Sequence, residues 1–561
     1  MRIIDYFNIF AAILYFLVVL LCILKKPAFL YAPADDVLKP RWEALLFTLL
    51  LGLGILLRFY RLAVLPEGMH QDEASNIYEA FSLSNYGIDR NGYTYPVYPI
   101  TWGSGGGNPI LIYSCALLFK FIEPSILAYR CVFAFLGSLT LILFYLFIRR
   151  VIDKRAALIG MGALAVMPWH VVLSRWGLDS NTIPFFCMLV LLLFLYANET
   201  KKTGLYLLTA FVSGLCLYCY GSATIAIPLF LLFSCTYSLW MKRLSIRQLI
   251  YSGIIFLLTV LPLATFYFIN LFDLPAITTP WFSIPRFTGR HPVFLPLNAS
   301  LPLNLLKNVL HLLQMLTVGV KDELWNYVPG YFTLYHFTFP LTFLGLFSGF
   351  KKVIQQMKTR EYNGSALMGC MLISALLFSL SLQQNINRMV FVFLPLIYFF
   401  ILGICTVGQY SRYLLGLVIL LLGMGSFSFV RDYFVEYGPM SNYLFMKGYG
   451  DAIAYAESVR REDQLVYSTY EGLASPFITA LVYSRTSPHD YLETAVYKSE
   501  DAEFKVAVSF TCYRFGLPLD IEEEHYYEHI LIIAASEKDR FEDLPYRMTQ
   551  FDNYVVLEYD K

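Results

Sequence analysis

The chain has 561 residues, of which 57% are hydrophobic and only 15% are charged. A water-soluble protein of this length needs more charged surface, so the composition excludes that class. The net charge is +1 and no basic tract stands out, so we expect no nucleic-acid partner. About 20 apolar residues cross a bilayer core. The chain contains that length many times over, which predicts a polytopic α-helical membrane protein.

Hydropathy predicts about twelve membrane-spanning helices. They are expected near residues 8–24, 43–59, 128–148, 156–173, 182–198, 204–220, 222–240, 249–270, 331–350, 364–382, 388–407 and 413–430. The first of them has no small-residue cleavage site before Lys25 and Lys26. We therefore interpret it as a retained helix rather than a signal peptide.

Lysine and arginine collect in alternate connections between these helices. The basic connections contain Lys25, Lys26, Lys39 and Arg41; Arg149, Arg150, Lys154 and Arg155; Lys201 and Lys202; Lys242, Arg243 and Arg247; Lys351, Lys352, Lys358 and Arg360; and Arg412. If the helices simply alternate, these connections share one side, which the positive-inside rule assigns to the cytoplasm. The N-terminus, the long loop after the second helix and the C-terminal region are then expected outside a plasma membrane.

We divide the chain into a membrane domain, residues 1–434, and an extracytoplasmic α/β domain, residues 435–561. The membrane domain has two large outer loops, 60–127 and 272–330. Within the first, segment 109–122 is only about two-thirds of a span and is interpreted as a helix on the outer membrane surface. The second loop is rich in proline and then amphipathic near residues 301–318, a pattern also compatible with the interface.

The C-terminal region is predicted to alternate between strands and a helix. Its strand-like runs are 464–467, 504–510, 529–535 and 554–559, and its helix is 451–461.

Two adjacent carboxylates, Asp72 and Glu73, follow the second span, with His70 beside them. The first turn of any surface helix favours negative charge, which gives the pair a purely structural interpretation. Against it, an ionised side chain at a bilayer edge is costly unless it is used or paired. A carboxylate here would take a proton from a hydroxyl nucleophile or bind a divalent cation. Since neighbouring helical residues point in different directions, the two acids should not share one role.

A second cluster lies at the outer end of the 156–173 helix, where the sequence reads PWHVVLSRWGLDSN. It contains His170, Arg175 and Asp179. Arg175 and Asp179 are four residues apart, so they form either a surface ion pair or a second carboxylate with a phosphate-binding cation.

Two further arginines lie at outer helix ends. Arg130 begins the 128–148 helix and Arg388 ends the run QQNINR. Each either extends to the lipid headgroups or holds a lipid-linked phosphate. Asp89, in the run DRNG, is expected in a turn. The Gly-rich segment 102–109 lacks the strand and helix context of a nucleotide loop and is expected to be mobile.

The runs LPEGMHQDEASNIYEAFSL, GIDRNG and MPWHVVLSRWGLDSN resemble the bacterial branch of the protein O-mannosyltransferase and aminoarabinose-transferase superfamily. These are GT-C glycosyltransferases, family 39-like, that use polyprenyl-phosphate sugars. The resemblance is strongest over residues 55–240 and continues weakly to about residue 430. The aspartate–glutamate pair after the first family helix is its most specific mark.

The resemblance implies a GT-C fold with roles for particular residues. Asp72 would be the catalytic carboxylate, Glu73 its structural or metal-assisting neighbour, and Asp179 the second acidic position. Arg130, Arg175 and Arg388 would be candidates for the donor phosphate. Together with His70, Asp89 and His170, from the polar runs described above, they make up the expected substrate-binding set. No DxD motif is present, so a divalent cation as cofactor is left open, with Asp72, Glu73 and His70 as its candidate ligands.

The expected reaction is inverting transfer of one sugar from a polyprenyl-phosphate donor to an acceptor on the outer face. The acceptor would be an envelope lipid, a polymer or a protein. The first alternative is a transporter or flippase of lipid-linked sugars, which predicts charged or broken helices near mid-membrane and repeated halves. The second is a membrane anchor whose working part is the C-terminal domain, although that domain shows no nucleophile triad or metal cluster.

Overall fold

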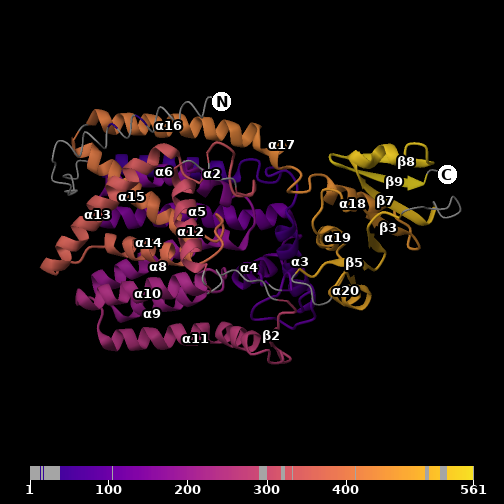
Figure 1. Cartoon of the computed structure of the whole chain (residues 1–561), viewed down its shortest axis with the longest axis horizontal. Coiled ribbons are helices and arrows are strands. Elements are labelled where there is room, and N and C mark those ends of the chain that lie inside the picture. Colours follow the sequence, from indigo (N-terminus) through magenta and orange to yellow (C-terminus); the bar gives the residue numbers. More distant parts are fainter. Residues whose placement is uncertain are drawn as a thin grey trace.

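The computed structural model describes residues 13, 17, 38–103, 105–289, 298, 300–317, 322–331, 333–410, 412–499, 504–518 and 527–559. Figure 1 shows a bundle of long helices with a small sheet-containing domain at one end. Apart from Ile13 and Leu17, the expected helix 8–24 lies outside the described residues.

The helices of the membrane domain are joined by short connections and by the two large loops. In chain order they are α2 (Pro40–Phe59), α3 (Gln71–Tyr86), α4 (Pro109–Leu118), α5 (Ile126–Val151), α6 (Lys154–Val166), α7 (Pro168–Leu173), the 3-10 turn η1 (Asp179–Thr182), α8 (Ile183–Thr200), α9 (Thr203–Cys216), α10 (Ala223–Trp240), α11 (Ile246–Leu271), α12 (Leu301–Thr317), the 3-10 turn η2 (His336–Thr338), α13 (Phe339–Thr359), α14 (Ser365–Leu380), α15 (Val390–Tyr410) and α16 (Arg412–Val435). By length and composition, 8 of the described segments are able to cross a membrane. They are α2, α5, η1 with α8, α10, α11, η2 with α13, α15 and α16.

Each expected span after the first coincides with a described helix, but length alone does not confirm twelve crossings. The span expected at 156–173 is divided into α6 and α7 at Pro168, because proline has no N–H for the helical ladder and clashes with the preceding turn. The span expected from residue 331 begins at Phe339 instead. Helices α9 and α14 are shorter apolar helices.

Helix α15 is enclosed by other helices, whereas α11 lies along one edge of the bundle (Figure 1). The apolar window of α15 is 94% buried, whereas that of α11 is 17% buried. Helices α13 and α15 pack backbone to backbone: a Cβ on Gly345 would lie 1.8 Å from the Phe399 carbonyl oxygen. Small residues allow this close approach between membrane helices.

The C-terminal domain contains a seven-stranded mixed sheet in the order β4-β5-β6-β3-β7-β9-β8. The strands are β3 (Leu465–Ser468), β4 (Val496–Tyr497), β5 (Ala507–Phe510), β6 (Tyr513–Phe515), β7 (His529–Ala534), β8 (Tyr546–Phe551) and β9 (Tyr554–Tyr559). Its helices are α18 (Tyr449–Val459), α19 (Pro476–Ser484) and α20 (Pro488–Thr494), and the short α17 (Tyr437–Ser441) connects it to α16. Strand β3 is parallel to β6 and β7. The four expected strand regions and the expected helix are present, whereas β4, β6, β8, α19 and α20 were not expected. The boundary at residue 434/435 stays a prediction.

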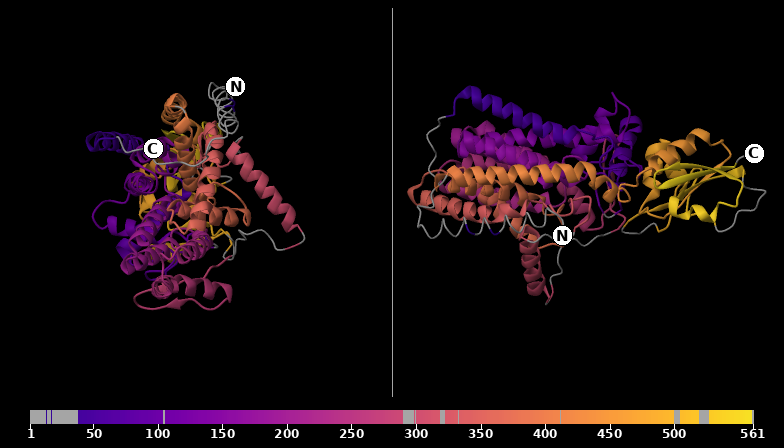
Figure 2. Two further views of the ribbon diagram at one scale, coloured as in Figure 1. Left: turned by 90° about the vertical axis from the view of Figure 1, so that its left-hand side faces the viewer. Right: turned by 90° about the horizontal axis from the view of Figure 1, so that it is seen from above.

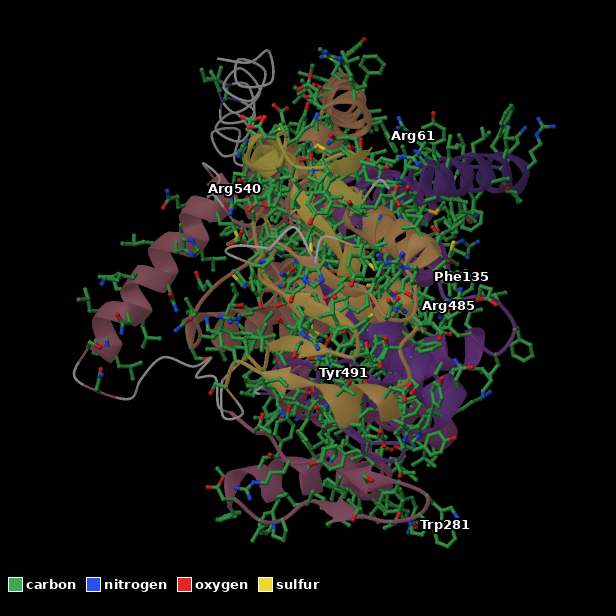
Figure 3. The ribbon with its side chains drawn as sticks, turned by 90° about the vertical axis from the view of Figure 1, so that its right-hand side faces the viewer. Arg61, Phe135, Trp281, Arg485, Tyr491 and Arg540 are labelled. Atoms are coloured by element: carbon green, nitrogen blue, oxygen red, sulfur yellow. The ribbon has the colours of Figure 1, made fainter. Side chains whose placement is uncertain are left out.

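The C-terminal domain packs against the first large loop of the membrane domain. Its buried apolar residues form one cluster with those of α3 and α4, and the Tyr78 hydroxyl donates to the Thr486 carbonyl oxygen at 3.0 Å. The Lys447 ammonium lies 2.9 Å from Glu67 and 3.2 Å from Asp552. Figure 3 looks onto this domain from its own end of the molecule, with Tyr491 near the middle of the view.

The second large loop contains a two-stranded ribbon and the helix α12. Strands β1 (Ile277–Thr278) and β2 (Ser283–Ile284) are antiparallel, and Trp281 between them lies at the outer edge of the molecule (Figure 3). Helix α12 occupies the segment that the sequence marks as amphipathic, and it projects away from the bundle (Figure 2). Its Asn308 side chain donates to the carbonyl oxygens of Leu380 and Leu382, so polar residues of α12 face the protein.

Candidate active site

The first large loop, the start of α8, the turn before α10 and the connection from α14 to α15 meet at the end of the bundle that faces the C-terminal domain. Figure 1 shows α3 and α4 at this end, next to α18 and α19. Asp72 lies in the first turn of α3, Asp179 begins η1, and Arg388 lies in the connection before α15. Three distant parts of the sequence therefore contribute to one end of the membrane domain.

Asp72 is the accessible carboxylate of the aspartate–glutamate pair. Its side chain is 29% exposed, and the Trp102 indole donates to Oδ1 at 3.1 Å. Helix α3 begins at this point because the ring of His70 accepts a hydrogen bond from the Asp72 amide. A carboxylate with one oxygen hydrogen-bonded and part of its surface open to solvent is able to take a proton from a substrate hydroxyl.

Glu73 points the other way, into the protein, as expected for the next residue of a helix. Its side chain is fully buried, and both oxygens accept hydrogen bonds at 2.8 Å from Arg130. Oε1 also accepts from the Gly177 amide at 2.9 Å, and Oε2 accepts from the His70 amide at 3.0 Å. The Arg130 guanidinium in turn donates to the carbonyl oxygens of Pro66 and Gly68. This bidentate ion pair fixes the loop before α3 against α5 and the segment that leads to η1.

Asp179 is held near Asp72 by two asparagines. The Asn76 amide donates to Oδ1 of Asp179 at 2.8 Å and to the Tyr129 hydroxyl at 3.0 Å. Asn108, which caps α4, donates to the Thr182 hydroxyl at 2.9 Å and to the Asp179 backbone oxygen at 3.4 Å. These bonds connect α3, α4 and η1, so the second carboxylate has a fixed orientation.

The Tyr220 phenol, in the turn before α10, connects the acids with Arg388. Burial raises the pKa of Tyr220 to about 12; the Arg388 cation opposes this rise, and the negative charges of Asp179 and Asp72 add to it. All three charged groups therefore act on one phenol. We call Asp72, Asp179, Tyr220 and Arg388 the site cluster.

Arg175 and His170 contact residues outside this cluster, whereas His70 lies beside Asp72, with its Nδ1 3.5 Å from Asp72 Oδ2. All donor nitrogens of Arg175 are used inside the protein: they donate to the carbonyl oxygens of Leu57, Arg58, Tyr60 and Leu65 and to the Tyr433 hydroxyl. His170 is fully buried, with Nδ1 2.5 Å from Arg58. The His70 ring is enclosed by Trp176, Trp325 and Phe445. These three candidates are therefore placed to hold helices and loops together.

Asp89 lies in the expected turn, where Oδ1 accepts hydrogen bonds from the amides of Asn91 and Tyr93 at 2.9 and 2.8 Å. Burial raises the pKa of Asp89 well above its ordinary value, and the nearby Glu79 carboxylate adds to that rise. Oδ2 is buried and has no hydrogen-bond partner among the described residues. The folded protein therefore favours a neutral side chain at this position.

Asp89→Asn should consequently raise stability at neutral pH. A carboxyl group whose pKa is raised by folding costs stability as the pH rises above about 3.9, its value in an unfolded chain. Asparagine has no such cost and keeps an oxygen for the turn. The melting temperature of the variant relative to the parent should therefore increase as the pH rises above about 4. The exposed Asp490→Asn is the control without this trend, and a variant that melts lower than the parent at pH 8 would contradict the assignment.

Three residues of this region were not expected from the sequence. Asn76 is four positions after Asp72, a spacing that puts both on one helix face, so this signal was available. Trp102 and Tyr220 enter from loops, and no periodicity in the sequence marks them. The Gly-rich segment expected to be mobile is instead held in a turn in its described residues, with hydrogen bonds from Thr101 to Gly105 and from Gly107 to Pro99.

A cation would find only part of the expected ligand set here. Among the described residues, no group of three or more His, Cys, Asp and Glu is placed to hold a metal ion. Glu73 is used by Arg130, and His70 Nδ1 accepts from an amide. Any divalent ion would therefore depend on Asp72 and Asp179.

Part of the chain matches a family model, and the fold matches solved structures. Residues 107–266 match the family model for dolichyl-phosphate-mannose-protein mannosyltransferases. The crystal structure of ArnT from Cupriavidus metallidurans bound to undecaprenyl phosphate is similar with a TM-score of 0.52 and 12% identity, covering 91% of this chain and 97% of that chain. The apo state gives a TM-score of 0.50 with the same identity and coverage. The chain therefore has the GT-C glycosyltransferase fold, as the resemblance predicted.

A second group of solved structures is more distant. The Archaeoglobus fulgidus oligosaccharyltransferase tethered to an acceptor peptide gives a TM-score of 0.48 and 12% identity, covering 79% of this chain and 63% of that chain. A comparison with curated protein sequences finds no match. The family match begins after the aspartate–glutamate pair, although the resemblance was expected to be strongest from residue 55.

Proposed function

We propose that the protein transfers a single sugar from a polyprenyl-phosphate donor to an acceptor on the outer face of the plasma membrane. The observation that carries the proposal is the site cluster at one end of the helix bundle: Asp72 is a partly exposed carboxylate, Asp179 is held by Asn76 of the same helix α3, and Arg388 is a half-buried cation before α15. A base for the acceptor and a cation for the donor phosphate are the two groups that this reaction needs.

The chemical step is a single displacement. The acceptor hydroxyl oxygen attacks the anomeric carbon of the sugar, the bond from that carbon to the phosphate oxygen breaks, and Asp72 takes the hydroxyl proton. Polyprenyl phosphate leaves with the bonding electron pair, and Arg388 stabilises the charge that develops on it. Attack from the side opposite the leaving group inverts the anomeric carbon.

Arg388 is the arginine best placed to meet the phosphate. Arg130 and Arg175 are fully buried and donate to protein oxygens. Arg388 is half-buried, and one of its Nη atoms donates to the Gln383 carbonyl oxygen at 2.9 Å. Its position beside Tyr220 puts it at the ends of α10 and α14, two helices that pack along each other.

In the proposal, the lipid tail lies against the surface where α10 and α14 pack together. Tyr220 precedes α10 and Arg388 follows α14, so the site cluster lies at one end of this contact. At the other end, between Trp240 of α10 and Ala366 of α14, is an apolar cavity of about 460 Å³. The tail lies along this contact in the proposal, with the phosphate at Arg388. ArnT, which shares the fold, was crystallised with undecaprenyl phosphate.

The orientation follows from where the basic residues lie. Helix α5 begins at the site end with Arg130 and carries Arg149 and Arg150 at its opposite end. Under the positive-inside rule that opposite end is cytoplasmic. The site cluster and the C-terminal domain are then outside, where an envelope lipid, polymer or protein serves as acceptor.

The experiment that tests the function follows release of polyprenyl phosphate from a panel of labelled polyprenyl-phosphate sugars. The purified protein is reconstituted in lipid, with crude envelope extract as acceptor. Release with one donor, coupled to labelling of an acceptor, supports the transferase and names the sugar. Movement of an intact donor across the vesicle membrane without any release would contradict it and favour the transporter.

Arg388→Gln should raise the KM for the donor about tenfold or more, with a smaller effect on kcat. The change removes a charge-assisted hydrogen bond to phosphate, worth about 1.5–3 kcal/mol, and each 1.4 kcal/mol is about a factor of ten. Initial rates over a range of donor concentrations measure it. Arg431→Gln, an exposed arginine on α16, is the matched control, and an unchanged KM in Arg388→Gln would remove Arg388 from the donor site.

A further inference from the structure

Trp102, in the first large loop, donates a hydrogen bond to the Asp72 carboxylate, on the oxygen other than the one that lies 3.5 Å from His70 Nδ1. Its indole N–H, the only hydrogen-bond donor of the side chain, lies 3.1 Å from Asp72 Oδ1. Trp102 begins the Gly-rich segment, and the next residue, Gly103, has φ of 81°. That left-handed conformation suits glycine and belongs to the turn in which Trp102 and Thr101 donate to the Gly105 carbonyl oxygen.

The face of the Trp102 ring is covered by Arg90. The guanidinium carbon lies 5.3 Å from the ring centroid, which is cation–π geometry. Arg90 is buried, and its Nε is 3.1 Å from the Glu79 carboxylate. Its two Nη atoms have no hydrogen-bond partner among the described residues. The indole face therefore stabilises the positive charge at the two Nη atoms of Arg90. The guanidinium in turn limits the rotation of the Trp102 ring.

The edge of the same ring meets the C-terminal domain. Phe477, in the first turn of α19, lies at right angles to the Trp102 ring with centroids 6.4 Å apart. Next to Trp102, Gly103 forms an antiparallel bridge with Phe504, which precedes β5. Helix α19 also packs against α3, the helix that carries Asp72. The Trp102 segment thus has contacts with both domains.

We propose that Trp102 is a positioning residue for Asp72, and that Arg90 and Phe477 hold its ring in the orientation that directs the N–H at the carboxylate. The proposal rests on Asp72 being the base of the proposed transfer. The proposal gives the C-terminal domain a second role besides any contact with the acceptor. Through Phe477 this domain helps to orient the Trp102 indole and, with it, the Asp72 carboxylate. The backbone hydrogen bonds of the segment fix its main chain, whereas the contacts with Arg90 and Phe477 restrict the orientation of the indole ring itself.

Three changes separate this role from simple packing. Trp102→Phe removes the N–H and keeps an aromatic ring, Phe477→Leu removes the edge contact, and Phe510→Leu alters another buried phenylalanine of the same domain. We expect Trp102→Phe to lower kcat about 10- to 100-fold, the scale of a small misplacement of a reacting group. The KM for the donor should not change, since the donor phosphate is held by Arg388. Phe477→Leu should lower kcat in the same manner, whereas Phe510→Leu should affect only the melting temperature.

The combined variants make the test decisive. If Phe477 acts through Trp102, the effects of the two changes should not be independent. The double variant with Trp102→Phe and Phe477→Leu should then lose much less kcat than the product of the two single losses. Wild-type kcat in Trp102→Phe, or a full multiplicative effect of the two changes, would overturn the proposal while leaving the transferase intact. Wild-type activity in Asp72→Asn, measured in parallel, would instead overturn the proposed base and the positioning role together.

Discussion

Asp72→Asn is expected to lower the rate of sugar transfer by about 10²–10⁴-fold, the usual contribution of a positioned general base. Asparagine has nearly the same shape and keeps an oxygen for the Trp102 indole at the position of Oδ1. What it loses is the ability to take the acceptor proton. The variant should therefore bind the donor with an unchanged affinity, and its release of polyprenyl phosphate should fall.

The control for this change is another aspartate in the first turn of a helix. Asp490 occupies that position in α20 and is exposed, so Asp490→Asn removes a favourable helix–charge interaction of about 0.3–1 kcal/mol without touching the site. Both variants should show similar small shifts in melting temperature, and only Asp72→Asn should lose activity. Equal activity in both would return Asp72 to the structural role that negative charge has at any helix start.

Hydropathy located most of the apolar helices in the described part of the chain, because long apolar segments in lipid have no alternative but to form helices. It did not show the division of residues 156–173 into α6 and α7, or the start of α13 at Phe339. It was less informative for the C-terminal domain. Strand β6, Tyr513–Phe515, is short, and β8 carries Arg547, Thr549 and Gln550 among its apolar residues. Their place in the sheet comes from pairing with β3, β5 and β9, a long-range property that local patterns do not contain.

The arginines of the site also show that local sequence patterns do not predict long-range contacts. Arg130, Arg175 and Arg388 all lie at the helix ends where the sequence placed them, and all three were candidates for the donor phosphate. Their surroundings separate them: Glu73 and two carbonyl groups surround Arg130, four carbonyl groups surround Arg175, and Arg388 faces Tyr220. Sequence gives the depth of such a residue in the membrane, whereas its partners depend on how the loops pack.

The largest loss of stability is expected at the Glu73–Arg130 ion pair. Both side chains are fully buried, so Glu73→Ala leaves a guanidinium without its counter-charge in a protein interior. Breaking a buried pair in this way costs about 3–5 kcal/mol. The melting temperature and the denaturant midpoint in detergent should both fall. Glu199→Ala, which breaks the exposed pair with Arg150, should cost at most about 1 kcal/mol.

A double variant distinguishes the lost pairing from a lost cap of α3. In Glu73→Leu with Arg130→Met, both charges are absent and the space is filled by apolar atoms, so much of the stability should return. If the double variant is as unstable as Glu73→Ala, the hydrogen bonds from Glu73 to the His70 and Gly177 amides are the dominant contribution instead. With either result, the role of Glu73 is to stabilise the fold. The proposed role of its neighbour Asp72 is different, namely to take the proton of the acceptor hydroxyl.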